Sequence, residues 1–135
     1  MASLTQDRAT PYRDGVEIDF PVAGNTKIYA GSLVCLNTSG YAAPAADTAS
    51  FKFAGVALAQ VDNTGGANGA KKVRLRRTGV FQFEAASITQ AMMGDAMYVV
   101  DDHTFDDAAG PTNDVRVGVL VKYESATKGW IDIGR

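Results

Sequence analysis

The sequence predicts an all-β protein, a small barrel or sandwich of roughly eight to ten short strands. Three observations carry this prediction. Apolar and polar residues alternate with the period of a strand in several short segments. Clusters of Gly and Asn, which are typical of turns, separate these segments. The two halves of the chain also resemble one another when the sequence is shifted by 63 positions.

Alternation is clearest in four segments. In such a segment one face enters a core and the other meets solvent or a partner. One further segment, Ser87–Met93, is predicted to be a short helix that Ser87 caps and Gly94 ends. In chain order, the alternating segments are Val16–Phe20, Lys72–Arg76, Phe81–Phe83 and Val115–Lys122.

The 63-residue shift places Gly31 on Gly94 and the pair Gly55-Val56 on Gly118-Val119. Because two separate anchors share one offset, we interpret the chain as two pseudo-repeated β units, residues 28–83 and 94–133. A twofold repeat of this kind is too short for a solenoid. We therefore expect one β-barrel domain over residues 16–135.

Two segments do not fit the strand pattern. Residues 1–15 have little periodicity, so they are either a frayed terminus or an arm that becomes ordered on a partner. The Gly- and Asn-rich segment Asp62–Ala70 is long for a hairpin connection and is either a mobile tip or a contact loop.

The first ten residues lack the apolar region of a signal peptide, and no apolar run is long enough to cross a bilayer.

Composition limits the function classes. The chain has 135 residues, a net charge of −2 and one cysteine, Cys35. The charge argues against a polyanion-binding protein, and a single cysteine cannot form an intrachain disulfide. Cys35 lies in an apolar run and is interpreted as a buried, inert thiol. A soluble protein made in a reducing compartment is expected.

The sequence offers no recognisable active site, so we expect no enzyme, cofactor or metal. The single histidine, His103, stands among the aspartates of residues 101–107. The spacing does not match a calcium-binding EF-hand, and zinc would require more His or Cys ligands. A hairpin turn with solvated acids explains the segment better. No glycine-rich phosphate loop is present, and nothing links Cys35 with His103 as nucleophile and base.

The basic segment Lys71–Arg77 is the most polarised part of the chain, and as a strand it would project Lys72, Arg74 and Arg76 from one face. Three interpretations stay open. The face could discourage edge-to-edge pairing, contact an acidic protein surface, or contact nucleic acid. The last is least favoured, because the chain is acidic overall and no aromatic residue among the cations could stack on bases.

A second candidate surface is apolar. It would form the interface of a symmetric oligomer, since a small chain gains core by burying an exposed face against a copy. Ordinary core filling is the alternative, because methionine adapts to irregular gaps. The candidates are Met92, Met93, Met97 and Tyr98.

The order of several pieces resembles the small capsid decoration (cement, head-stabilising) proteins of tailed bacteriophages and prophages. The pieces are VAGNTKIYAGSLVCLNTSGYAAPA, FAGVALAQVDNTGGANGAKKVRLRRTGVFQF, GDAMYVVDDHTF and VRVGVLVKYESATKGWIDI, spanning about Val22 to Ile133. The resemblance implies a compact β-barrel or β-tulip on the outer surface of an expanded shell, made in the host cytoplasm. It also implies the major capsid protein as partner and a homo-oligomer, with a trimer favoured over a dimer.

Decoration proteins of this kind frequently carry an N-terminal arm that contacts the shell. The resemblance therefore implies a contact arm here, with Thr10, Pro11, Tyr12 and Arg13 as its candidates. Two other classes are kept as alternatives. One is another phage β-module from a tail, neck or fibre base, which recognises a partner or a glycan. The other is a small β-clip enzyme whose site forms across subunit interfaces.

Overall fold

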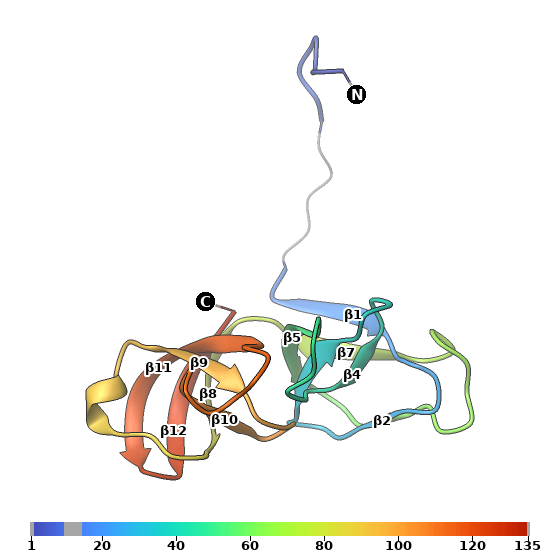
Figure 1. The fold of residues 1–135 in the computed structure, drawn as a ribbon. Coiled ribbons are helices and arrows are strands. Elements are labelled where there is room, and N and C mark those ends of the chain that lie inside the picture. The colour runs from blue at the N-terminus through green and yellow to red at the C-terminus, as the bar shows by residue number, and fades with distance from the viewer. Residues whose placement is uncertain (1, 10–14, 135) are drawn as a thin grey trace.

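The computed structural model describes residues 2–9 and 15–134 and is built almost entirely of strands, which confirms the all-β prediction (Figure 1). The elements are short, as expected for segments separated by Gly- and Asn-rich turns. In chain order they are β1 (Glu17–Pro21), β2 (Lys27–Ile28), β3 (Leu33–Leu36), β4 (Ala42–Pro44), β5 (Lys52–Ala57), β6 (Val61–Asp62), β7 (Lys72–Arg76), β8 (Gly79–Ala85), the 3₁₀ turn η1 (Gln90–Met92), β9 (Ala96–Val99), β10 (Thr104–Asp106), β11 (Arg116–Ser125) and β12 (Lys128–Ile133).

The strands form two units that lie side by side (Figure 1). The first unit is a five-stranded sheet in the order β1-β7-β5-β3-β4, and the second is a closed barrel in the order β8-β12-β11-β9-β10. The two orders are the same once β8 is matched with β1, β9 with β3, β10 with β4, β11 with β5 and β12 with β7. The chain is therefore an internal duplication of one small β unit.

Strand register repeats at the offset seen in the sequence. Three of the four pairs of partners between β3 and β5 recur 63 residues later between β9 and β11, and a register shift falls at the corresponding point in both pairings. The Leu33–Val56 pair recurs as Ala96–Val119, Val34–Gly55 recurs as Met97–Gly118, and Cys35–Phe53 recurs as Tyr98–Arg116.

The seam that closes each unit also repeats, but it is weaker in the first. In the second unit β10 runs parallel to β8, with Phe105 opposite Ala85, and the corresponding bridge in the first unit joins Val22 to Ala42. The N–H of Glu84 strengthens the second seam by donating to the carbonyl of His103 at 3.1 Å. Pro21 occupies the position that corresponds to Glu84 and has no N–H to donate.

Two sequence-based expectations need correction. The repeat boundaries at 28–83 and 94–133 are wrong, because they assign β8 to the first unit. In the structure β8 opens the second unit, just as β1 opens the first. The short helix expected over Ser87–Met93 is reduced to the single 3₁₀ turn Gln90–Met92, and Thr89 precedes it without a capping side-chain hydrogen bond. A segment this short lacks the hydrogen bonds that stabilise an α-helix.

The two units share part of their core. The larger apolar cluster belongs mainly to the second unit but includes Leu33, Cys35 and Val56 of the first. Cys35 is fully buried, and burial raises the pKa of its thiol to about 12, as expected for an inert core cysteine. Among the described residues there is no helix with the length and hydropathy needed to cross a membrane.

Candidate functional site

Four of the residues proposed for shell contact, Thr10, Pro11, Tyr12 and Arg13, lie outside the described residues. The neighbouring segment, residues 2–9, contains no helix or strand, and each of its side chains is exposed. Leu4 is 74% exposed, the largest fraction among the large apolar side chains of the described residues. Figure 1 shows this segment apart from both units. An exposed apolar side chain on such a segment is available to a partner.

The basic strand β7 has the predicted alternation. Val73 and Leu75 are buried, whereas Lys72 and Arg74 are exposed and Arg76 is half-buried. The suggestion that this face protects a sheet edge is wrong, because β7 pairs with β1 on one side and β5 on the other. The charged side chains of β7 therefore lie within a sheet rather than at its edge.

Acidic residues of β1 partly neutralise this basic face. Arg74 lies 3.1 Å from a carboxylate oxygen of Asp19 and 3.5 Å from one of Glu17. Arg76 binds the other oxygen of Glu17 at 3.0 Å. A surface whose cations are already paired attracts an acidic partner less strongly than the sequence alone suggests.

Reversing both arginines is expected to destabilise the fold. In the variant R74E/R76E four acidic side chains would face one another across β1 and β7, so we expect the free energy of unfolding to fall by about 1–2 kcal/mol. Denaturant unfolding measures this change. Restoring the pairing with E17R and D19R in the same chain should recover most of the loss, and no recovery would contradict the assigned ion pairs.

The apolar candidates do not form one exposed face. Met97 is fully buried, so its assignment to an oligomer interface is corrected to the core. Met92 packs against the same core and is only partly exposed, and Tyr98 is half-buried. Met93 is the one exposed member of the set, at 37%. The alternation of β9 explains this result, since it turns Met97 inward.

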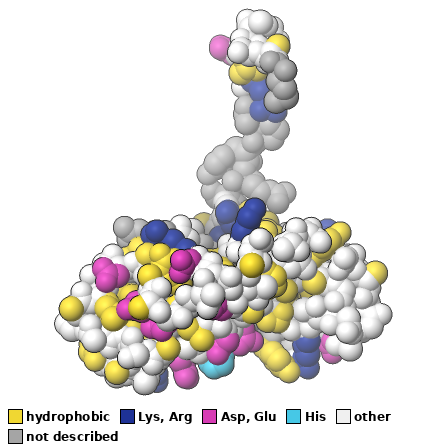
Figure 2. All heavy atoms as spheres, viewed as in Figure 1, with side chains coloured by type: hydrophobic (Ala, Val, Ile, Leu, Met, Phe, Trp, Pro, Cys, Tyr) yellow, Lys and Arg dark blue, Asp and Glu magenta, His cyan; other side chains and the backbone are white. Residues whose placement is uncertain are grey.

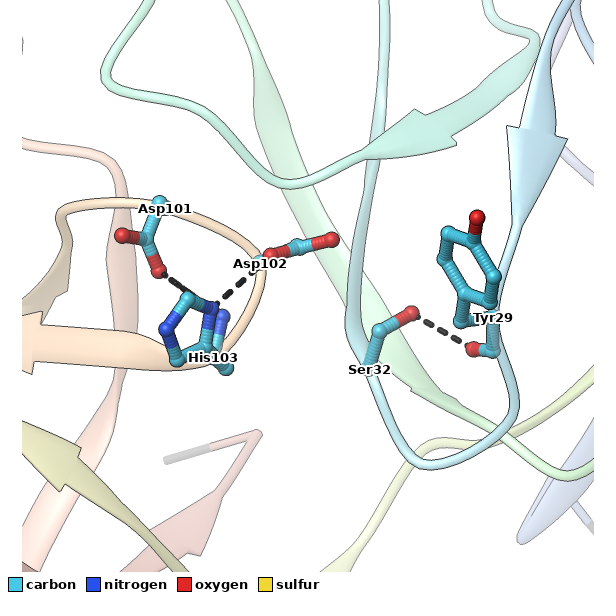
Figure 3. Close-up of polar contacts among 5 residues, drawn as sticks. All are labelled: Tyr29, Ser32, Asp101, Asp102 and His103. Atoms are coloured by element: carbon cyan, nitrogen blue, oxygen red, sulfur yellow. Dashed lines mark hydrogen bonds and ion pairs between the residues drawn. The ribbon is translucent and has the colours of Figure 1, made fainter.

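Among the described residues, one group of potential metal ligands lies close together in the turn that holds His103 (Figure 3). It consists of Asp101, Asp102 and His103. The Nδ1 atom of His103 lies 3.0 Å from a carboxylate oxygen of Asp102 and 3.1 Å from one of Asp101. Its hydrogen bond with Asp102, followed by the charge of Asp101, raises the pKa of His103. In Figure 2 the histidine (cyan) lies among acidic side chains at the lower edge of the visible face.

Local structure accounts for much of this arrangement. The backbone N–H of His103 donates to the Asp101 carboxylate at 2.9 Å, which is a common way to stabilise a turn. The carbonyl of Asp102 accepts the N–H of Leu33, in the first unit, at 2.8 Å. Figure 3 shows that the turn faces the segment of Tyr29 and Ser32. The turn therefore joins the two units.

A second link between the units centres on Asp47, which the sequence did not single out. Its two carboxylate oxygens accept the backbone N–H groups of Thr112 and Asn113, both at 2.8 Å. The side-chain amide of Asn113 donates to the Asp47 carbonyl at 3.0 Å. These bonds connect the β4–β5 loop of the first unit to the β10–β11 loop of the second. The hydrogen bonds, led by that of Thr112, lower the pKa of Asp47.

The Asp47 link is expected to make stability depend on pH. Because the pKa of Asp47 is lower in the folded state, its stabilisation is present above the unfolded pKa and is lost as pH falls through the folded pKa. We expect D47A to lower the free energy of unfolding by about 1 kcal/mol at pH 7. Below about pH 4 the difference from the wild type should shrink. Denaturant unfolding of D47A and wild type at pH 7 and below about pH 4 tests this prediction. A difference in free energy of unfolding that is the same at both would contradict it.

Beside the Asp47 link lies a hollow of about 620 Å³, which we call the junction pocket. The β3–β4 turn contributes Asn37, Thr38 and Gly40, the start of β5 contributes Ser50 to Lys52, and the second unit contributes Asn113. A smaller hollow of about 310 Å³ lies between Gly31 and the outer side of β8 and β12. No single motif marks the junction pocket, since its walls are far apart in the sequence.

Comparison with known proteins adds no relative. No family model matches the chain, and no match is found among the curated proteins or the solved structures. The fold and its surfaces define a duplicated small β unit with a partly neutralised basic face, a joining turn and a junction pocket.

Proposed function

We propose that this chain is a non-enzymatic structural protein that binds the outside of an assembled bacteriophage capsid and stabilises contacts between major capsid subunits. The observation that carries the proposal is the duplication. Two units of one topology on a single body suit a clamp that contacts two neighbouring copies of a repeated partner, one with each unit. Such bivalent binding gains avidity from contacts that are individually modest.

Two further observations support this function. Residues 2–9 are exposed and carry the exposed apolar Leu4, as suits a segment that contacts a partner. The Asp101–His103 cluster, the metal-binding candidate of the described residues, is accounted for as a turn between units. A protein that clamps a shell needs no catalytic group. The resemblance of the sequence to decoration proteins points in the same direction.

The partner proposed is the major capsid protein, and the location is the outer surface of the virion. We also propose a homo-oligomer, with a trimer favoured over a dimer. Light scattering of the purified chain measures the oligomeric state. A strict monomer would contradict the trimer, while leaving assembly on the shell to be judged by binding.

Co-sedimentation with expanded heads of the encoding phage or prophage tests the function. We expect the full chain to sediment with expanded heads and much less with unexpanded shells. The reason is that the capsid surface that the chain binds is proposed to form when the head expands. Deleting residues 1–13 should leave the melting temperature of the body unchanged and weaken binding about tenfold. A full chain that stays in the supernatant with expanded heads would overturn the proposed function.

A further inference from the structure

The junction pocket has the size and position of a binding site. Its volume of about 620 Å³ lies within the range of about 300–1,000 Å³ found for specific ligand sites. It is formed by both units, and such sites occur preferentially at the boundary between structural units. The bonds of Asp47 to Thr112 and Asn113 hold the two loops of this boundary together.

Several polar groups around the pocket can donate hydrogen bonds, whereas Asn113, whose NH₂ group donates to the Asp47 carbonyl, leaves its side-chain oxygen as an acceptor. The side-chain oxygen of Asn37 accepts the backbone N–H groups of Ser39 and Tyr41, both at 3.0 Å. These two bonds fix the amide, so what Asn37 offers to a ligand is its NH₂ group. Thr38 and Ser50 add hydroxyl groups, which can also donate.

The charge around the pocket is positive. Lys52 lines it and no aspartate or glutamate does. Within the described part of the chain Lys52 forms no salt bridge, in contrast to Arg74 and Arg76 on the neighbouring strand. Two acids neighbour lining residues in the sequence, Asp114 beside Asn113 and Asp47 before Ser50, and neither lines the pocket. Asp47 uses both carboxylate oxygens on backbone N–H groups. A cation and fixed donors, with no acid in the lining itself, favour an anionic ligand.

The second unit does not repeat this pocket. Lys52 corresponds to Val115 under the 63-residue offset, and Val115 is 3% exposed. Ser50 corresponds to Asn113, which already lines the same pocket from the second unit. The two copies of the unit have therefore diverged at this point, and the chain carries the cation in one place.

We propose that the junction pocket receives an aspartate or glutamate side chain from a loop of the capsid subunit. The carboxylate would bind Lys52 and the amide of Asn37, while the aliphatic stem would contact Leu36 and Phe51. The anion chemistry follows from the pocket itself, and the choice of a capsid loop rests on the proposed function. Complementary charge of this kind sets register and specificity at an interface.

The anion preference is tested by nuclear magnetic resonance on the isotopically labelled full chain. The probes are the blocked peptide acetyl-Gly-Asp-Gly-amide, its Asn counterpart, and glucuronate. We expect the Asp peptide to shift the backbone signals of residues 37–40, 50–52 and 113, and the Asn peptide to leave them unchanged. Absence of these shifts, or stronger shifts with glucuronate than with the Asp peptide, would overturn the proposal.

The capsid loop is tested by co-sedimentation of K52E and K52Q with expanded heads. We expect K52E to weaken binding about tenfold and K52Q to weaken it less. The matched control is K122E, since Lys122 is 66% exposed on β11 of the other unit, away from the pocket. Equal binding of K52E and wild type would overturn the pocket and leave the proposed function standing. Wild type that fails to sediment would overturn the function and the capsid loop together.

Discussion

Replacing Gly118 with alanine is expected to lower the free energy of unfolding by about 3 kcal/mol. Gly118 lies in β11 opposite Ile133 of β12. A methyl group at this position would overlap the carbonyl oxygen of Asp132 and come within 2.9 Å of the Ile133 Cα atom. These are backbone atoms within a paired strand, so relief requires the two strands to separate. Denaturant unfolding of G118A measures the cost.

The duplicated position gives this prediction an internal replicate. Gly55 corresponds to Gly118, and a methyl group there would meet the carbonyl of Arg76 in β7. We therefore expect G55A to destabilise the protein by a similar amount. G15A is the matched control, because the nearest atom to its methyl group is the flexible end of Arg77. If G118A and G55A behaved like G15A, the close strand approach would be contradicted.

The same close approach explains why the duplication was visible in the sequence. Gly55 and Gly118 each lie at the point where a strand passes too near its neighbour for a side chain, so both units keep glycine there. Gly31 and Gly94 both adopt positive φ, at 80° and 87°, and donate equivalent hydrogen bonds to the carbonyls of Ala57 in β5 and Leu120 in β11. Positions fixed by backbone geometry preserve the repeat when side-chain chemistry does not.

The first strand of each unit shows the reverse case. Glu17 in β1 faces Arg76 across the sheet, whereas Val80, its counterpart in β8, faces Asp132. Positions that are at least partly exposed, such as these, can change chemistry without disturbing the fold. Phe20 and Phe83 match at the 63-residue offset, but the surrounding side chains of β1 and β8 differ, and the unit boundaries were drawn in the wrong place.

The last strand of each unit departs from the 63-residue offset. Val73 in β7 corresponds by its pairing to Gly129 in β12, at an offset of 56 residues instead of 63. The cause is the connection before it. Fourteen residues, 58–71, join β5 to β7, whereas only residues 126–127 join β11 to β12. An insertion in one copy removes the alignment beyond it.

The candidate surfaces were less predictable than the fold. Alternation correctly placed Arg74 and Arg76 on the outer side of β7, but it could not indicate that Glu17 and Asp19 pair with them. That neutralisation depends on which strand lies beside β7. The junction pocket depends on two loops from different units, so its donors become a set only after folding.

The second large effect is expected at Asn63, in the long loop that the sequence left open between a mobile tip and a contact loop. Asn63 is 2% exposed. Its NH₂ group donates to the carbonyls of Ala23 at 2.9 Å and Ala67 at 3.0 Å. Its backbone N–H donates to the Thr26 carbonyl at 2.9 Å. One buried side chain thus ties the loop to the segment that follows β1.

We expect N63A to lower the free energy of unfolding by about 2–3 kcal/mol, because it leaves buried carbonyls without donors. N63D should cost more, since it places a carboxylate beside those carbonyls. The matched control is N68A. Asn68 accepts the N–H of Gly24 at 2.7 Å through its side-chain oxygen, but this bond is exposed, so its loss should cost less than about 1 kcal/mol.

Hydrogen exchange measured on the same variants distinguishes the two interpretations of the loop. The Gly66 N–H donates to the Asn63 carbonyl and the Asn25 N–H donates to the Gly66 carbonyl, so both amides should exchange slowly in the wild type. In N63A they should exchange faster while the amides of β11 and β12 stay protected. Rapid exchange in the wild type would mean that the loop is a mobile tip. Slow exchange would mean that the duplicated body carries, on its first unit only, an ordered projection able to contact a partner without an ordering cost.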